Sequence, residues 1–142
     1  MEDQELFTLF RNNGYKVTPQ RLAIYKFILT RKDHPTADQI YQELKVEYPT
    51  LSLGTIYKTL HTLKELGLIQ ELGFSEGRIR YDPDMELHIN MVCSKCGIIY
   101  DHKTENVRKL WYAILDELNV KPENQRIDIY YECDDCRTIN SN

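Results

Sequence analysis

Apolar residues in the first half of the chain recur at intervals of three or four, which is typical of helices with one buried face. A first short helix is predicted from Leu6, Phe7, Leu9 and Phe10, and it should stop at Gly14. A second helix is predicted to begin at Thr18 and Pro19, because threonine is a good N-cap and proline fits the first helical position. Its buried face is expected to contain Leu22, Tyr25, Ile28 and Leu29.

Two more helices are predicted before Gly67. Thr36 and Gln39 have the spacing of a capping box, and the helix that they open should end before Pro49. Ser52 is the predicted cap of the fourth helix, and Gly67 stands where a left-handed residue commonly ends a helix. The residues expected to face inward are Ile40, Leu44, Ile56, Leu60 and Leu63.

The periodicity then changes from that of helices to that of strands. Segments 68–72 and 78–82 predict two short strands, joined through 73–77 as a hairpin. A helix pair followed by a hairpin predicts a winged helix-turn-helix, whose fourth helix would enter the major groove of DNA. The polar segment 82–87 is interpreted as a hinge, so domains are expected at 1–83 and 84–142.

Beyond the hinge the pattern predicts a small α/β domain. Strands are expected at 89–92, 98–101 and 126–133, and an amphipathic helix between the last two. Its apolar face contains Val107, Leu110, Trp111, Ile114, Leu115 and Leu118. The predicted fold class is therefore α+β, an N-terminal winged helix-turn-helix domain and a C-terminal α/β dimerisation domain. A domain of about 60 residues usually needs a metal or a partner chain for stability.

The four cysteines suggest such a metal. They form two pairs, Cys93-x-x-Cys96 and Cys133-x-x-Cys136, separated by 36 residues. Two pairs with this spacing can surround one tetrahedral Zn²⁺ in a closed structural site. Disulfides or a redox-active CxxC are the weaker interpretation, because a thioredoxin-like motif needs one reactive pair in a βαβ context.

Charge is unevenly distributed along the chain. The net charge of −4 argues on its own against nucleic-acid binding. Residues 1–80 nevertheless balance at +1 and residues 81–142 at −5, and residues 11–32 carry six Lys or Arg with no acid. Such a patch can meet phosphates, although a solvated helix face explains it equally well. The sequence has no long apolar run and an acidic N-terminus, so a cytoplasmic protein without membrane contact is expected.

Five segments together carry a resemblance to a known family. Residues 14–21, 34–38, 52–58, 67–69 and 93–97 resemble, in the same order, the ferric uptake regulator (Fur) superfamily. The resemblance implies a homodimeric, metal-dependent DNA-binding regulator, in most cases a repressor. It also implies an A·T-rich palindromic operator, a structural Zn²⁺, and neither enzymatic activity nor a small organic substrate.

The regulatory metal site resembles that of the peroxide-sensing branch. Position by position, the resemblance implies His34, Asp82, His88 and Asp101 as ligands of Fe²⁺ or Mn²⁺. The chain departs from the pattern at Asn90, where a second histidine is expected, and the sequence leaves open whether Asn90 coordinates. His102 cannot easily replace it, because it follows Asp101 on a strand and should point to the opposite face.

The resemblance also implies a mechanism and a DNA surface. Peroxide would be sensed through iron-catalysed oxidation of His34 or His88. A reversible sensor of iron or manganese levels is the alternative, and a zinc-containing thiol redox enzyme is a distant third. The residues expected at DNA are Lys16, Arg21, Ser52, Thr55, Tyr57 and Lys58, with Tyr57 against bases and Lys16 in a minor groove.

Overall fold

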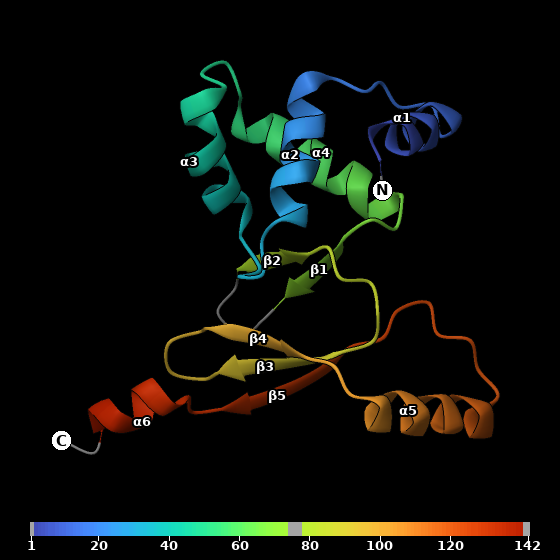
Figure 1. Cartoon of the computed structure of the whole chain (residues 1–142), viewed down its shortest axis with the longest axis vertical. Helices are drawn as coiled ribbons and strands as arrows, with labels where there is room; N and C mark the ends of the chain where they lie inside the picture. Colours follow the sequence, from blue (N-terminus) through green and yellow to red (C-terminus); the bar gives the residue numbers. More distant parts are fainter. Residues whose placement is uncertain (1, 74–77, 141–142) are drawn as a thin grey trace. The chain divides into compact units, whose positions relative to one another are not determined.

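The computed structural model describes residues 2–73 and 78–140 and divides into two compact units, Met1–Met85 and Glu86–Asn142 (Figure 1). The elements of the first unit are α1 (Asp3–Asn12), α2 (Pro19–Leu29), α3 (Ala37–Glu47), α4 (Leu53–Glu65), β1 (Gln70–Gly73) and β2 (Ile79–Asp82). Those of the second unit are β3 (Ile89–Cys93), β4 (Ile99–His102), α5 (Glu105–Leu118), β5 (Ile127–Tyr131) and α6 (Asp134–Asn140). Among these helices none is long and apolar enough to cross a lipid bilayer.

The predicted helix starts of the first unit are confirmed by their caps. The Thr18 hydroxyl accepts the backbone N–H of Arg21 at 3.2 Å, with Pro19 at the first helical position. Thr36 and Gln39 form the reciprocal capping box, with bonds of 3.2 and 2.8 Å. Ser52 caps α4 by accepting the N–H of Thr55 at 3.1 Å. Each side chain satisfies a backbone donor that the helix itself leaves without a partner.

The first unit is built around one apolar core. Its members come from all four helices and from the hairpin: Leu6, Phe10, Ile24, Tyr25, Ile28, Ala37, Ile40, Leu44, Leu51, Ile56, Leu60, Leu63, Ile69 and Tyr81. The prediction that Leu29 is buried is wrong, because its side chain is 43% exposed. Ile28 is fully buried as predicted, and so is Ile24, which was not among the predicted residues. Leu29 follows Ile28 by one residue, which turns it about 100° around the helix and away from the core.

The hairpin of the first unit is antiparallel, with Gln70 opposite Asp82 and Leu72 opposite Arg80. The predicted turn at 74–77 lies outside the described residues. A backbone bridge between Thr36 and Arg80 joins β2 to the turn that precedes α3. The hairpin is thereby attached to the helix pair, which gives the first unit the winged helix-turn-helix arrangement (Figure 1).

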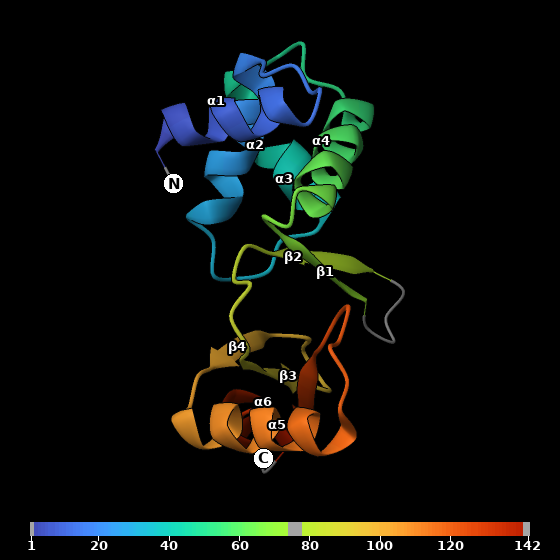
Figure 2. The same cartoon turned by 90° about the vertical axis from the view of Figure 1, so that its right-hand side faces the viewer.

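The second unit contains a mixed sheet in the order β4-β3-β5, with β3 antiparallel to β4 and parallel to β5. The connection between β4 and β5 contains α5, which lies beyond one end of the strands in Figure 1 and runs across the view below β3 and β4 in Figure 2. No residue of α5 is buried in the single chain, and Leu110 and Leu118 are 63% and 61% exposed. The short helix α6 follows β5 and was not predicted.

Candidate metal centres and nucleic-acid surface

The four cysteines of the second unit form one cluster. Their sulfur atoms all lie within 4.8 Å of one another. Cys93 Sγ lies 3.8 Å from Cys136 Sγ, and Cys96 Sγ lies 3.8 Å from Cys133 Sγ. Four sulfurs at such distances from one another match the tetrahedral ligand set of a structural Zn²⁺.

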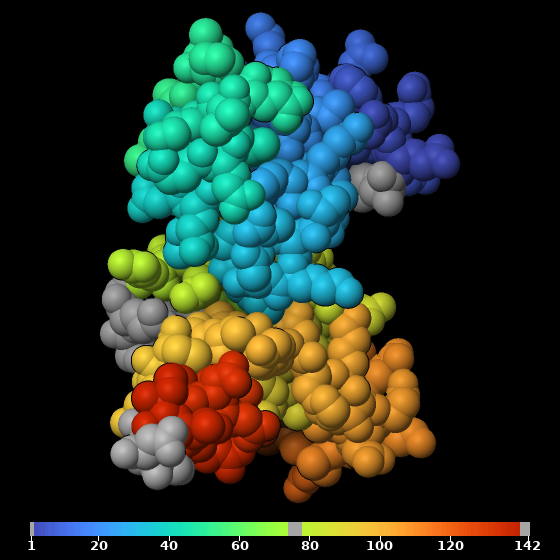
Figure 3. All heavy atoms as spheres, turned by 60° about the vertical axis from the view of Figure 1, so that its left-hand side comes forward, coloured from blue at the N-terminus to red at the C-terminus, as the bar shows by residue number. Residues whose placement is uncertain are grey.

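The sheet explains why two pairs that are distant in sequence meet. Cys93 ends β3 and lies opposite Tyr131 of β5, and the N–H of Ser94 donates to the Tyr131 carbonyl at 2.8 Å. The second pair follows β5 directly, so it begins beside the first. Gly97 closes the first knuckle with a φ of 75°, a conformation that glycine adopts without strain. In Figure 3 the red C-terminal segment lies in front of the yellow and gold atoms of the strands.

The local electrostatics favour a cation among these sulfurs. Backbone N–H groups, first that of Cys96 and then that of Cys133, lower the pKa of Cys93 to about 6. The neighbouring Cys133 sulfur, followed by burial, raises the pKa of Cys136 to about 12. The first thiolate therefore forms easily, and each additional negative charge becomes harder to place. A Zn²⁺ ion removes that repulsion and keeps all four sulfurs ionised.

The first unit brings together two of the predicted regulatory ligands. His34 Nε2 lies 3.4 Å from Asp82 Oδ2, and both residues are 2% exposed. The N–H of Tyr81 donates to the Pro35 carbonyl at 3.0 Å, which places the end of β2 beside the turn that carries His34. His34 itself has a φ of 53°, unusual for a residue with a side chain. We call His34 and Asp82 the first donor pair.

The second unit brings together the other three. His88 Nε2 lies 3.0 Å from Asn90 Oδ1 and 3.5 Å from Asp101 Oδ1. His88 directly precedes β3 and Asn90 lies two residues further along, and both side chains are buried. His102, the residue after Asp101 on β4, is exposed. We call His88, Asn90 and Asp101 the second donor group.

Sequence reasoning did not find two groups that touch the second donor group. The Glu86 carbonyl oxygen lies 2.7 Å from His88 Nδ1, and Asp128 Oδ1 accepts from Asn90 Nδ2 at 3.0 Å. Asp128 lies 38 residues from Asn90 in sequence. Only the register of two parallel strands could have indicated the contact, and no local signal encodes that register.

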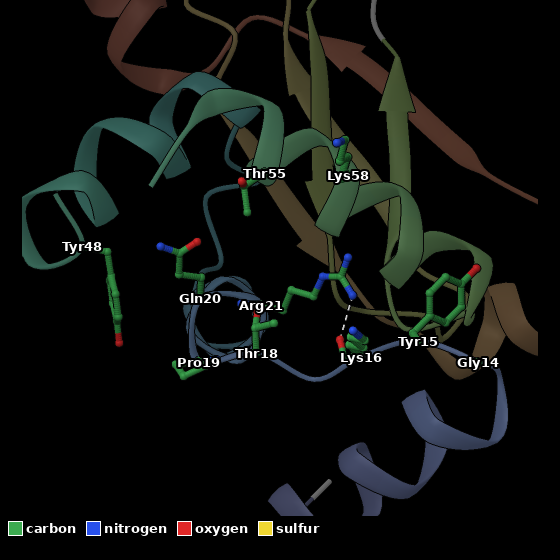
Figure 4. Close-up of a pocket in the computed structure, with 10 residues that line it drawn as sticks. All are labelled: Gly14, Tyr15, Lys16, Thr18, Pro19, Gln20, Arg21, Tyr48, Thr55 and Lys58. Atoms are coloured by element: carbon green, nitrogen blue, oxygen red, sulfur yellow. Dashed lines mark hydrogen bonds between the residues drawn. The ribbon is translucent and has the colours of Figure 1, made fainter. Parts of the chain in front are cut away.

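Four of the six predicted DNA-binding residues, Lys16, Arg21, Thr55 and Lys58, line a groove of the first unit, with a volume of about 840 Å³ (Figure 4). Its lining residues are Gly14, Tyr15, Lys16, Thr18, Pro19, Gln20, Arg21, Tyr48, Thr55 and Lys58. Three of these are basic and none is acidic, which suits a phosphate backbone. Arg21 Nη1 donates to the Lys16 carbonyl at 2.7 Å, so the segment before α2 is held next to the groove.

The other two predicted residues do not line this groove. The exposed Ser52 caps α4 and lies 2.9 Å from the Thr55 hydroxyl. Tyr57 is 50% exposed and lines a second pocket of about 410 Å³, together with Arg78 of the hairpin. A large, half-exposed aromatic side chain on α4 can contact the edges of bases in a major groove.

A winged helix-turn-helix unit with a basic groove, followed by a unit built around four sulfurs, defines a metal-containing DNA-binding transcription regulator. The sequence profile of the ferric uptake regulator family matches residues 12–130. The chain belongs to the ferric uptake regulator family.

Known relatives agree with this assignment. The chain is 37% identical over 137 residues to the peroxide-responsive repressor PerR of Staphylococcus saprophyticus, covering 94% of this chain and 90% of the relative. Among solved structures, the Campylobacter jejuni peroxide stress regulator has a TM-score of 0.75 at 32% identity, covering 96% of this chain and all of that one. The Helicobacter pylori ferric uptake regulator has a TM-score of 0.81 at 19% identity, covering 94% and 90%, and that likeness concerns the fold alone.

Proposed function

We propose that the chain is a peroxide-responsive repressor in which one regulatory metal ion is held by donors from both units. The observation that carries the proposal is the chemistry of the first donor pair and the second donor group. Four of the five side chains are buried, those of His34, Asp82, His88 and Asn90, and burying such groups is costly unless they are paired or bind an ion. The similarity to peroxide-responsive relatives supports the same function.

The donor atoms fit Fe²⁺ or Mn²⁺. Together the two groups offer two imidazoles, two carboxylates and one amide oxygen, a set that suits these ions better than it suits a soft metal. Neither group has enough donors by itself for the five or six that such ions take. Asp82 and His88 are only six residues apart in sequence, so one ion can draw ligands from both groups.

An ion held in this way would control DNA binding. It would favour the one arrangement of the two units in which both donor groups share it, and so act as a ligand that selects a state. In a homodimer, this arrangement would set the spacing of the two α4 helices on a palindromic, A·T-rich operator. Loss of the ion or of a ligand would release the operator.

Peroxide sensitivity would arise at the histidines. Ferrous iron held by these residues would supply the electrons that reduce hydrogen peroxide, and the side chains that hold it would be the ones exposed to oxidation. His34 and His88 are the oxidisable ligands. The addition of one oxygen to an imidazole weakens it as a donor, so the response would be irreversible and would leave the four cysteines intact.

Mass spectrometry of peptides tests the proposal. The zinc-loaded protein receives Fe²⁺ without oxygen and then a small excess of hydrogen peroxide. We expect a gain of one oxygen on the peptides that contain His34 or His88, and no gain with Mn²⁺. The exposed His61 and His102 are internal controls that should remain unmodified.

The same samples are tested for binding to an A·T-rich palindromic duplex. Binding should require metal in the wild type and in His102→Ala, and should lose its metal dependence in His34→Ala. If His34→Ala still binds the duplex in a metal-dependent manner, the shared ion is the wrong mechanism.

The second candidate is a reversible sensor of iron or manganese levels. Asn90 favours it, because an amide oxygen in place of an imidazole suits Mn²⁺ and weakens the hold on iron. Unmodified histidines in a sample that demonstrably contains iron would decide for this second function.

A further inference from the structure

A row of three polar side chains crosses the sheet of the second unit at Asn90. In the antiparallel pairing Asn90 lies opposite Asp101 of β4, and in the parallel pairing it lies opposite Asp128 of β5. Residues at the same register position of adjacent strands point to the same face of the sheet. Asn90 is therefore placed between two aspartates, one from the second donor group and one to which no role has been assigned.

The hydrogen bonds of Asn90 determine which way its amide points. Asn90 Nδ2 donates to Asp128 Oδ1 at 3.0 Å. A carboxylate only accepts hydrogen bonds, so the nitrogen must face Asp128 and the oxygen must face the other way. The opposite orientation would bring two oxygens together. On its other side the amide meets His88, with 3.0 Å between Asn90 Oδ1 and His88 Nε2.

The orientation of the His88 ring is likewise determined by a hydrogen bond to a group that can only accept. Its Nδ1 lies 2.7 Å from the Glu86 carbonyl oxygen, which can only accept, so Nδ1 carries the hydrogen. In the neutral ring Nε2 then has a lone pair. His88 Nε2 and Asn90 Oδ1, which both carry lone pairs, lie 3.0 Å apart, and Asp101 Oδ1 lies 3.5 Å from the same Nε2. Such a set of acceptors is complementary to a cation.

Asp128 is itself fixed in place. Arg126 Nη2 lies 2.7 Å from Asp128 Oδ2, and Arg126 Nε donates to Asp128 Oδ1 at 3.0 Å. The Asp128 side chain is 17% exposed and that of Arg126 is 25% exposed. A two-point pairing with a planar guanidinium restricts the carboxylate more than a single bond does.

We propose that Asp128, clamped by Arg126, is a positioning residue that turns the Asn90 amide oxygen toward the regulatory metal and so makes Asn90 a ligand. This inference rests on the metal site proposed above. It explains how the chain can keep a complete donor set with an amide at a position where its resemblance to peroxide sensors predicts a histidine. Partners of this kind, behind a ligand, typically change metal affinity 10- to 100-fold.

A double-mutant cycle tests it. Calorimetric titration measures Mn²⁺ affinity of the zinc-loaded protein without DNA, for the wild type, Asp128→Ala, Asn90→Ala and the double variant. Each single variant should bind Mn²⁺ about tenfold more weakly. The double variant should be no weaker than Asn90→Ala, because Asp128 acts only through Asn90. An equal loss from Asp128→Ala in both backgrounds, or no loss at all, would overturn the inference.

Two further variants separate orientation from charge. Asp128→Asn removes the charge but keeps an oxygen that can accept from Asn90 Nδ2, so its Mn²⁺ affinity should stay near that of the wild type. Asp116→Ala removes the same charge from an exposed position on α5 and should have no effect. A loss with Asp128→Asn as large as that with Asp128→Ala would show that only the charge matters, against the inference.

The remaining arms guard against ambiguous results. If Asp128→Ala does not fold, Arg126→Ala takes its place, and it should weaken Mn²⁺ binding only when Asn90 is present.

His88→Ala tests the metal site itself. If neither His88→Ala nor Asn90→Ala changes Mn²⁺ affinity, the regulatory site proposed above is wrong as well. A loss with His88→Ala alone, with Asn90 and Asp128 neutral, contradicts only the present inference.

Discussion

At the scale of single residues, we expect the choice of regulatory metal to depend on the donor atom at position 90. Asn90 offers an oxygen, which is a harder ligand than an imidazole nitrogen. The Asn90 side chain is buried, and because its Nδ2 donates to Asp128, its amide oxygen faces His88 Nε2. The side chain at this position should therefore tune the preference between Mn²⁺ and metals that favour nitrogen.

We expect Asn90→His to shift that preference. An imidazole would present one nitrogen to the metal and donate the other N–H to Asp128, an arrangement that raises ligand basicity. The affinity for Co²⁺, a spectroscopic substitute for Fe²⁺, should rise about tenfold relative to Mn²⁺. Competition titrations measure the ratio. Asn90→Ala is the control and should weaken the binding of both ions, while an unchanged ratio in Asn90→His would exclude a role for Asn90 in metal choice.

The same residues show what could be predicted of the site from sequence. The family resemblance pointed to His34, Asp82, His88 and Asp101, and the members of each donor group lie next to one another. Asp128 was missed because its contact with Asn90 depends on the pairing of two strands that are far apart in sequence. Local patterns report on caps and periodicity, whereas strand register is decided by the packing of the whole sheet.

At the scale of elements, the helices of the first unit were predicted well because their caps are local. Thr18, Thr36 and Ser52 each bond to a residue three positions ahead, which a sequence pattern can express. Leu29 was misassigned because apolar residues surround most of α2, so periodicity does not define one face. The helix α6 was missed because it has only seven residues and follows directly on Cys133.

The N-cap of α4 allows stability and DNA binding to be separated. Ser52→Ala removes the cap and should lower the free energy of unfolding by about 1 kcal/mol. Ser52→Asp keeps a cap, since aspartate accepts the same bond, but it adds a negative charge where phosphates are expected. We expect normal thermal stability and weakened DNA binding for Ser52→Asp. Melting curves and duplex titrations at fixed salt measure both effects, and unchanged DNA affinity in Ser52→Asp would place Ser52 away from the phosphates.

At the scale of the whole molecule, the two units have different sources of stability. The first unit has one apolar core with members from every helix. The second unit has a three-stranded sheet, an exposed α5 and the cysteine cluster. A unit of this size with so little buried apolar surface depends on its metal and on a partner chain.

Removal of zinc should therefore affect the units unequally. In Cys96→Ser, or after strong chelation, we expect the second unit to lose its thermal transition while the first unit keeps its own. Amide hydrogen exchange measures both in one sample, with protection lost in β3 and β5 and retained in α2 and α4. Ser94→Ala is a control in the same knuckle that leaves the four sulfurs intact. Equal loss of protection in both units would show that the units are not independently stable.

The exposed face of α5 should bind a second copy of the chain. Leu110 and Leu118 are exposed on α5, and Ile129 and Tyr130 are exposed on β5. We expect Leu110→Asp to weaken dimerisation at least tenfold, because a charge would be buried in an apolar interface. Sedimentation velocity measures the dimer fraction. Val46→Asp on α3, at a position that is 80% exposed, is the matched control and should leave the dimer intact.

The parallel pairing of β3 with β5 also determines when the second unit can finish folding during synthesis of the chain. The first unit closes through contacts between neighbouring helices and can form while the ribosome is still making the rest of the chain. The central strand β3 must wait for β5 and for Cys136, because both are synthesised after it. A cell that is short of zinc would then accumulate new chains in which the DNA-binding unit is folded but the second unit cannot dimerise. The zinc supply would thus determine how much functional regulator is present, and the regulatory metal would determine whether that regulator binds its operator.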